Sequence, residues 1–145
     1  MDNFNPLKLE NQLCFPLYAA SREVIRRYRP RLEELDLTYT QYIAMMVLWE
    51  EKKISVHGLG EKLFLDSGTL TPVLKSLESK GYITRARSRE DERVLIASIT
   101  EKGEELRKAA LKVPEGIASC IPLEPGEAGE LYKLLHKLLD AFREG

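Results

Sequence analysis

Apolar residues recur at helical spacing near the amino end of the chain. The stripe returns every three or four positions, which predicts one face of a helix that Pro30 bends or ends. Its members are Leu9, Leu13, Leu17, Ala20, Val24 and Tyr28. After a break at residues 36–38, a second helix is predicted over about residues 40–51. We expect this helix to bury, to different degrees, Tyr42, Ile43, Met46, Val47 and Trp49.

A helix pair followed directly by a hairpin is predicted in the middle of the chain. A very short strand at residues 54–55 comes first, and Gly81 is expected to cap the second helix of the pair. Alternating apolar positions after Gly81 predict two strands, joined by a polar segment at residues 88–93. The predicted helices and strands are residues 56–64, 67–80, 82–87 and 94–99. This is the order of a helix-turn-helix with a hairpin behind it.

Two more helices are predicted after the hairpin. Thr100 is a suitable N-cap for a helix that ends at about Lys112. A stretch that contains Pro114, Pro122 and Pro125 follows, and a last helix is predicted over residues 127–143. Four helices, two strands and two helices in this order predict a winged helix-turn-helix. The expected fold class is mainly α with a small β-hairpin wing (α+β).

Length and charge narrow the class of protein. The 145 residues suit one domain of ordinary size, residues 1–145. The 22 Lys and Arg nearly balance the 23 Asp and Glu, so any binding of nucleic acid must depend on a local patch. No apolar run approaches the ~18–20 residues that cross a bilayer, and the first residues lack the pattern of a signal peptide. We expect a soluble, cytoplasmic protein with no membrane partner.

The second helix of the pair has the composition of a DNA-reading surface. Leu70, Val73, Leu74 and Leu77 fall within ~100° of one another on a helical wheel, which predicts the buried face. The remaining positions are small, hydroxylic or basic, as suits close approach to phosphates and base edges. They are Ser67, Gly68, Thr69, Thr71, Pro72, Lys75 and Ser76. Pro72 is tolerated because the residue four positions back is Gly68.

The hairpin adds positive charge beside this helix. Arg85, Arg87 and Arg89 alternate, so they are expected on one side of the hairpin. Asp91 lies among acidic residues that would repel phosphate, unless it holds Arg93 in a carboxylate-guanidinium pair that fixes the tip of the wing. A solvated hairpin without a partner is the alternative interpretation. Together with the helix pair, the arginines favour binding of double-stranded DNA.

Terminal helices predict a homodimer. The last helix carries an apolar stripe too wide for a lone surface helix: Leu131, Leu134, Leu135, Leu138, Leu139 and Phe142. Burial against a second copy would set two reading helices ~34 Å apart, which suits a palindromic operator. We therefore expect about residues 37–100 to bind DNA, and about 7–35 and 101–143 to form dimerisation helices. In the alternative, these helices simply close the core of a monomer.

Several segments resemble the MarR family of dimeric winged-helix repressors. The segments FLDSGTLTPVLKSLESKG and ITRARSREDERVLIASITEKG are similar to its helix-turn-helix and wing. The segments LENQLCFPLYAASRE and LTYTQYIAMMVLWE, together with Tyr28, resemble more specifically the OhrR branch, whose members sense organic hydroperoxides. The resemblance extends from about Leu7 to Leu139. It implies a repressor, not an enzyme, that needs no cofactor or metal and leaves its operator when an organic hydroperoxide oxidises it.

The resemblance assigns the sensing chemistry to Cys14. Such a sensor needs a thiolate and donors that hold it, and the branch implies Tyr28 and Tyr39 as phenolic donors. Tyr28 lies 14 positions beyond Cys14 on the predicted helix, ~21 Å at 1.5 Å per residue, so the site must combine two subunits. Tyr18, one helical turn from Cys14, is expected to support the pocket. Cys120 corresponds to a second cysteine that forms an intersubunit disulfide in some relatives.

Other interpretations of these residues remain open at this stage. Cys14 and Cys120 could be inert core thiols. A MarR-type repressor released by a non-covalent phenolic or drug-like ligand is a second functional hypothesis. A thiol peroxidase is a third, although the two histidines, His57 and His136, show no metal-ligand spacing. Pro16 suits only a first turn, so the first helix is expected to begin close to Cys14. That start would either bring the sulfur nearer the positive end of the helix or shift it from the expected pocket.

Overall fold

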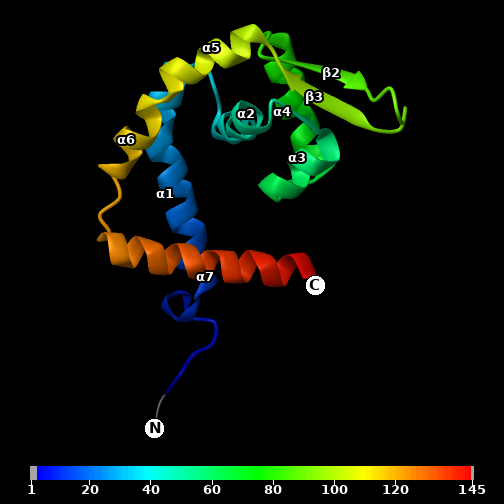
Figure 1. Ribbon diagram of the computed structural model, residues 1–145. Coiled ribbons are helices and arrows are strands. Elements are labelled where there is room, and N and C mark those ends of the chain that lie inside the picture. Colours follow the sequence, from blue (N-terminus) through cyan, green and yellow to red (C-terminus); the bar gives the residue numbers. More distant parts are fainter. Residues whose placement is uncertain (1–2, 145) are drawn as a thin grey trace.

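The computed structural model describes residues 3–144 and consists mainly of helices, with a small antiparallel sheet at one side (Figure 1). The elements in chain order are η1 (Leu9–Asn11), α1 (Cys14–Glu33), α2 (Tyr39–Glu51), β1 (Lys53–Ser55), α3 (Val56–Leu63), α4 (Ser67–Ser79), β2 (Ile83–Arg87), β3 (Leu95–Ile99), α5 (Glu101–Ala110), α6 (Lys112–Ala118) and α7 (Pro125–Glu144). The predicted fold class, mainly α with a hairpin wing, is confirmed.

Helix α1 begins later and ends later than the apolar stripe predicts. It starts at Cys14, and Leu9 lies in a separate short 3₁₀ turn. Pro16 is then the third residue of the helix, where a proline costs no hydrogen bond. Pro30 does not end the helix, because α1 continues to Glu33. Only the last turn follows Pro30, and Leu32 in that turn is buried in the core.

Helix α2 begins with a capping box and forms the centre of the core. The hydroxyl of Thr38 accepts from the backbone N–H of Gln41, and the Gln41 side chain accepts from the N–H of Thr38. Tyr42, Met45 and Leu48 are buried. The expected burial of Met46 is wrong, because the face toward the core passes through Met45 and leaves Met46 exposed.

The sheet has the strand order β1-β3-β2, and both pairs are antiparallel. In the hairpin Ile83 pairs with Ile99 and Arg87 with Leu95, so strands β2 and β3 match the prediction to within one residue. The short strand β1 adds to the other edge of β3. Ile83 and Ala97 are buried and connect the sheet to the core between α2, α3 and α4.

The carboxy-terminal part contains one helix more than predicted. Thr100 caps α5 as expected, through its hydroxyl and the N–H of Gly103. The stretch after Lys112, expected to be irregular, instead forms α6, because Pro114 is the third residue of that helix and costs no hydrogen bond there. Helix α6 packs along α1. In the view of Figure 1, α7 passes across the amino-terminal part of α1. Among the described residues no helix is long and apolar enough to span a membrane.

Candidate nucleic-acid interface and thiol site

The sequence separates α4 into a buried and an exposed face, as predicted. Leu70, Val73, Leu74 and Leu77 are all buried. Asp66 caps the helix by accepting from the N–H of Thr69 at 2.7 Å, and this backbone hydrogen bond holds the pKa of the Asp66 carboxyl below its usual 3.8. The exposed residues between positions 67 and 75 of α4 are Ser67, Gly68, Thr69, Pro72 and Lys75.

Two hydroxyl groups of α4 are already hydrogen-bonded. Thr71 is half-buried and donates to the carbonyl of Ser67 at 2.7 Å. Ser76 is turned toward α2, where its hydroxyl accepts from the Gln41 side chain at 2.9 Å. The expectation that Ser76 belongs to the outward reading face is therefore corrected, because the buried Gln41 amide needs this partner.

The arginines of the hairpin do not form one uniform stripe. Arg87 and Arg89 are exposed, as expected. Arg85 is not a free surface cation: it is paired with Glu78 of α4 at 3.1 Å, and its side chain is only 18% exposed. Glu78 also accepts from the backbone N–H of Arg85 at 3.0 Å. The hydrogen bond from the Arg85 guanidinium lowers the pKa of Glu78, so the pair fastens the wing to α4.

The tip of the wing is closed by Asp91 and Arg93, as predicted. Asp91 Oδ1 accepts from Arg93 Nε at 3.1 Å and Oδ2 accepts from Arg93 Nη2 at 3.3 Å. The N–H of Val94 donates to the Asp91 carbonyl at 3.0 Å and completes the turn. The hydrogen bond from Arg93 lowers the pKa of Asp91. Arg93 itself stays 90% exposed and is held in one direction.

Cys14 is the first residue of α1 and is exposed. Tyr18, one turn further along, is also exposed and has the guanidinium of Arg22 5.4 Å from its ring centroid. Arg22 follows Tyr18 by one helical turn, whereas Cys14 precedes Tyr18 by one turn, so the guanidinium and the cysteine lie on opposite sides of Tyr18 along the helix. The helix begins at Cys14, as the position of Pro16 predicts, so Cys14 lies at the amino end of the helix.

Three tyrosines gather where α1 meets α2. The ring centroids of Tyr28 and Tyr39 are 4.9 Å apart, and Tyr42 lies 5.8 Å from Tyr28 and 6.4 Å from Tyr39. Burial raises the pKa of all three phenols above the usual 10.0. Tyr42 is missing from the site expected from the sequence, although its position three residues after Tyr39 puts both rings on one face of α2.

Tyr28 and Cys14 lie on the same helix but far apart. Fourteen residues of α-helix separate them, which is ~21 Å along the axis. The structure therefore keeps Tyr28 and Tyr39 away from the cysteine of their own chain, as the spacing predicts.

Cys120, just after α6, lies beside Arg31 of α1. Its sulfur is 3.7 Å from Arg31 Nη2 and donates to the Gly116 carbonyl at 3.4 Å. A Cβ at position 116 would collide with the Arg31 side chain, so glycine leaves the space through which Arg31 reaches the sulfur. Sequence reasoning missed Arg31, since 89 residues separate the two and no short motif joins them.

Among residues 125–143 of α7, none is buried in the core. The large side chains on its apolar face remain exposed at four positions, Leu131, Leu134, Leu138 and Phe142. The alternative that this helix closes the core of a monomer is contradicted by that exposure. Helix α7 contacts the helix-turn-helix through its last turn, where the Arg143 guanidinium lies 4.1 Å from the centroid of the Phe64 ring.

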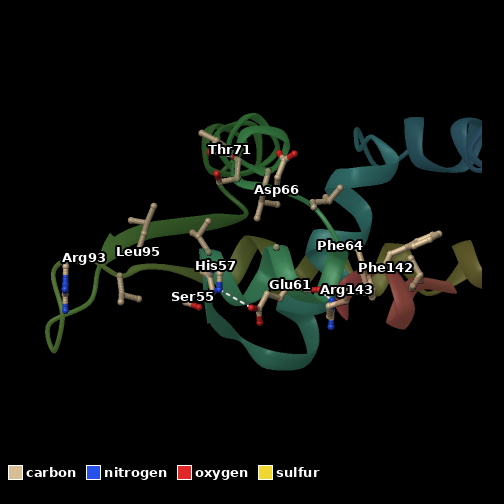
Figure 2. A pocket seen from close by; sticks show the side chains of 17 residues that line it. Ser55, His57, Glu61, Phe64, Asp66, Thr71, Arg93, Leu95, Phe142 and Arg143 are labelled. Atoms are coloured by element: carbon tan, nitrogen blue, oxygen red, sulfur yellow. Dashed lines mark hydrogen bonds and ion pairs between the residues drawn. The ribbon is translucent and has the colours of Figure 1, made fainter. Parts of the chain in front are cut away.

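An open groove of about 1130 Å³ lies between this contact and the wing (Figure 2). Its walls come from α3, the first turn of α4, the root of the wing and the end of α7. Figure 2 shows Phe142 and Arg143 on one side of it and Arg93 on the other. Among the described residues, no cluster of His, Cys, Asp and Glu could hold a metal ion.

A helix pair with a small, basic outer face, followed directly by a wing that is fastened to it, defines a winged helix-turn-helix protein. Residues 26–110 match the family described as Transcriptional regulator SarA/Rot. The chain is 46% identical over 145 residues to the organic hydroperoxide resistance transcriptional regulator of Bacillus subtilis, covering 99% of each chain. It belongs to the MarR/SarA group of winged-helix transcriptional regulators, in the branch of the organic hydroperoxide regulators. The resemblance predicted from the sequence is confirmed.

Solved structures of AbfR from Staphylococcus epidermidis have the same fold. Reduced AbfR bound to DNA is 38% identical, with a TM-score of 0.78, and the match covers 94% of this chain and 93% of that one. The disulfide form of AbfR is 36% identical, with a TM-score of 0.68, over 92% and 91% of the chains. These relatives are transcriptional regulators, which confirms the prediction that the chain is not an enzyme.

Proposed function

We propose that the chain is a homodimeric repressor that binds a palindromic operator and releases it when an organic hydroperoxide oxidises Cys14. One observation carries this proposal. Tyr28 and Tyr39 pack together where α1 meets α2, away from the cysteine of their own chain and beside the DNA-binding part. In a dimer, Cys14 of one subunit would approach Tyr28 and Tyr39 of the other, so sensing and subunit arrangement are coupled.

DNA contact is assigned to α4 and the wing. Small and hydroxylic residues at the start of α4, with Lys75, face a major groove, while Arg87, Arg89 and Arg93 approach the phosphates. Thr71 completes the reading face, and Arg85 acts by fastening the wing rather than by direct contact. The DNA complex of reduced AbfR supports DNA as the partner. As a DNA-binding regulator, the protein is expected to act in the cytoplasm.

The dimer is assigned to the terminal helices. The exposed apolar face of α7 and the exposed Leu13 and Leu17 near the amino end need a partner surface, and a second copy supplies both. Two reading helices on one face of the dimer would meet successive major grooves, ~34 Å apart.

Cys14 is the nucleophile of the proposed sensing reaction. Its thiolate attacks one peroxide oxygen, the O–O bond breaks, and the leaving alkoxide takes a proton, so that a sulfenic acid and an alcohol form. The phenols of Tyr28 and Tyr39 donate to the thiolate before this step and lose that contact after it. Tyr18 supports the pocket from the side of Cys14.

Cys120 is assigned the second step. Its thiolate attacks the sulfenic sulfur of Cys14 in the other subunit, a disulfide forms, and hydroxide leaves as water after taking a proton. The disulfide form of AbfR supports this assignment. A Cys120→Ser variant should remain monomeric on a non-reducing gel after oxidation, whereas the wild-type chain should run as a covalent dimer.

A gel shift tests the whole proposal. A promoter duplex is incubated with reduced protein, then with cumene hydroperoxide, and finally with dithiothreitol. We expect the shifted band to disappear with the oxidant and to return with the reductant. A Cys14→Ser variant should keep the band throughout. Release of that variant by the same oxidant would favour a repressor with a non-covalent ligand, which the relatives do not favour.

A further inference from the structure

Lys80, at the carboxy end of the reading helix α4, contacts the connection between α1 and α2. Its ammonium group donates to the carbonyl of Asp36 and, at 3.0 Å, to Gln41 Oε1. The carboxylate of Asp36 lies 3.7 Å away. The Lys80 side chain is 24% exposed, whereas Asp36 is almost fully exposed. The far end of α4 is therefore tied to the segment that enters α2.

Gln41 provides the second half of this tie. It is 7% exposed and is the one buried polar residue in the described part of the chain. Its oxygen accepts from the N–H of Thr38 at 3.1 Å as well as from Lys80, and its nitrogen donates to Ser76 at 2.9 Å. One side-chain amide thus joins the first turn of α2 to the last turn of α4. A buried network with every partner present is rigid, and losing a partner is costly.

The connection between α1 and α2 has the properties of a hinge. Asp36 adopts the left-handed conformation, with φ at 54°, where residues other than glycine are strained. Tyr28 lies before this connection and Tyr39 directly after it, and the two rings pack across it. Figure 1 shows α2 between α1 and α4, so the same connection joins the expected dimerisation helix to the DNA-binding part.

We propose that Lys80, Gln41 and Ser76 form a polar latch that transmits a change in the Tyr28–Tyr39 pair to the reading helix. The proposal rests on the function proposed above and names the residues that carry its signal. Tyr39 is the first residue of α2, and Gln41 stands on the same turn. A displacement of Tyr39 therefore moves the amide that holds Ser76 and Lys80, and α4 turns with it. These three residues position α4 and do not contact DNA.

A double-mutant cycle on reduced protein tests the latch without any oxidant. The probe is the duplex recovered by in vitro selection with reduced wild-type protein, and its Kd is measured by fluorescence anisotropy. Tyr28→Leu disturbs the tyrosine pair, and Lys80→Met removes the latch cation while keeping the aliphatic chain. Latch coupling predicts that the effect of Tyr28→Leu on Kd changes by about threefold or more in the Lys80→Met background. Ser76→Ala leaves the capping box intact. It should change the effect of Tyr28→Leu on Kd in the same direction as Lys80→Met does.

Two controls separate the latch from other roles of Lys80. Lys108→Met removes an exposed lysine of α5 that pairs with Glu105, and its effect should add independently to that of Tyr28→Leu. Lys80→Met should leave the slope of log Kd against log salt unchanged, because Lys80 does not neutralise a phosphate. Additive effects in the Lys80→Met cycle, no effect of Tyr28→Leu, or a shallower salt slope for Lys80→Met would overturn the latch.

A separate arm tests the function on which the latch depends. The same wild-type complex is treated with cumene hydroperoxide. If the wild-type protein does not leave the duplex, the proposed sensing reaction is wrong. The double-mutant cycle on reduced protein still tests the latch in that case, because it uses no oxidant.

Discussion

The rings of Tyr28 on α1 and Tyr39 on α2 pack 4.9 Å apart across the connection between the two helices. This contact joins the helix that carries Cys14 to the helix that holds the reading helix. Tyr42 completes the cluster, with its ring centroid 5.8 Å from that of Tyr28. This contact therefore links α1 to the helix-turn-helix.

Burial of the tyrosine cluster predicts a pH dependence on the alkaline side. The pKa values of Tyr28, Tyr39 and Tyr42 are raised above 10.0, so the folded state favours their neutral form. Their contribution to the free energy of unfolding is present in full below pH 10.0 and is lost as the pH rises through the raised values. A phenolate absorbance titration should show some of the six tyrosines ionising late.

Two substitutions serve as controls for that titration. Tyr28→Phe should remove one of the late-ionising phenols, whereas Tyr132→Phe, which replaces an exposed tyrosine of α7, should leave all three of them in place. Ionisation of Tyr28, Tyr39 and Tyr42 near pH 10.0 would contradict the buried cluster.

The wing tip predicts a loss of DNA affinity without a loss of stability. Asp91→Asn removes the carboxylate that fixes Arg93, so we expect the Kd for DNA to rise by roughly threefold to tenfold. The melting temperature should hardly change, because the pair is exposed. The lowered pKa of Asp91 means that the pair persists at neutral pH and is lost only as the pH falls below 3.8. Glu90→Gln, which removes the same charge one residue away, should not weaken binding.

The exposed face of α7 predicts the oligomeric state. Leu134 is 54% exposed within one chain, and Leu134→Glu would place a charge in the expected dimer interface. Sedimentation should then show monomers, and the affinity for a palindromic duplex should fall by roughly a hundredfold because one reading helix remains. Lys133→Glu, on another face of α7, should stay dimeric. A Leu134→Glu dimer that binds DNA like the wild type would refute this interface.

Gly103 predicts a stability effect at the junction of α5 and the sheet. A Cβ at this position would lie 2.8 Å from Ile99 Cγ1 and overlap the Tyr82 carbonyl, while the Gly103 carbonyl accepts from Trp49 Nε1 at 2.8 Å. Gly103→Ala should lower the free energy of unfolding by about 1–3 kcal/mol in urea titrations. Gly129→Ala, in the interior of α7 with no atom close to the added Cβ, should raise it by up to about 1 kcal/mol. Equal changes in the free energy of unfolding for Gly103→Ala and Gly129→Ala would contradict the close packing at Gly103.

Features set by local pattern could be predicted from the sequence. The buried leucines of α4 follow the helical period, and Thr100 and Gly81 mark the ends of helices by their cap chemistry. The wing follows from alternation, and the Asp91–Arg93 pair from a spacing of two residues.

Features that join distant segments could not be predicted. Ser76 pairs with Gln41 across 35 residues, so its hydroxyl looked available for DNA. Arg85 alternates with Arg87 but is captured by Glu78, which lies on another element. Helix α6 could not be predicted because Pro114 favours a break in the sequence pattern, whereas the first turn of a helix accommodates it.

The central claim is that the sensing site combines Cys14 of one subunit with Tyr28 and Tyr39 of the other. A mixed dimer, purified with two different tags, tests it: one subunit carries Cys14→Ser, and the other carries Tyr28→Phe and Tyr39→Phe. Its one remaining Cys14 then faces intact tyrosines only if the site crosses the dimer. Sulfenic acid formation with cumene hydroperoxide, measured by trapping, should proceed at the wild-type rate per Cys14, about tenfold or more faster than in the dimer with both tyrosines replaced throughout. A mixed dimer as slow as that tyrosine variant would contradict the claim.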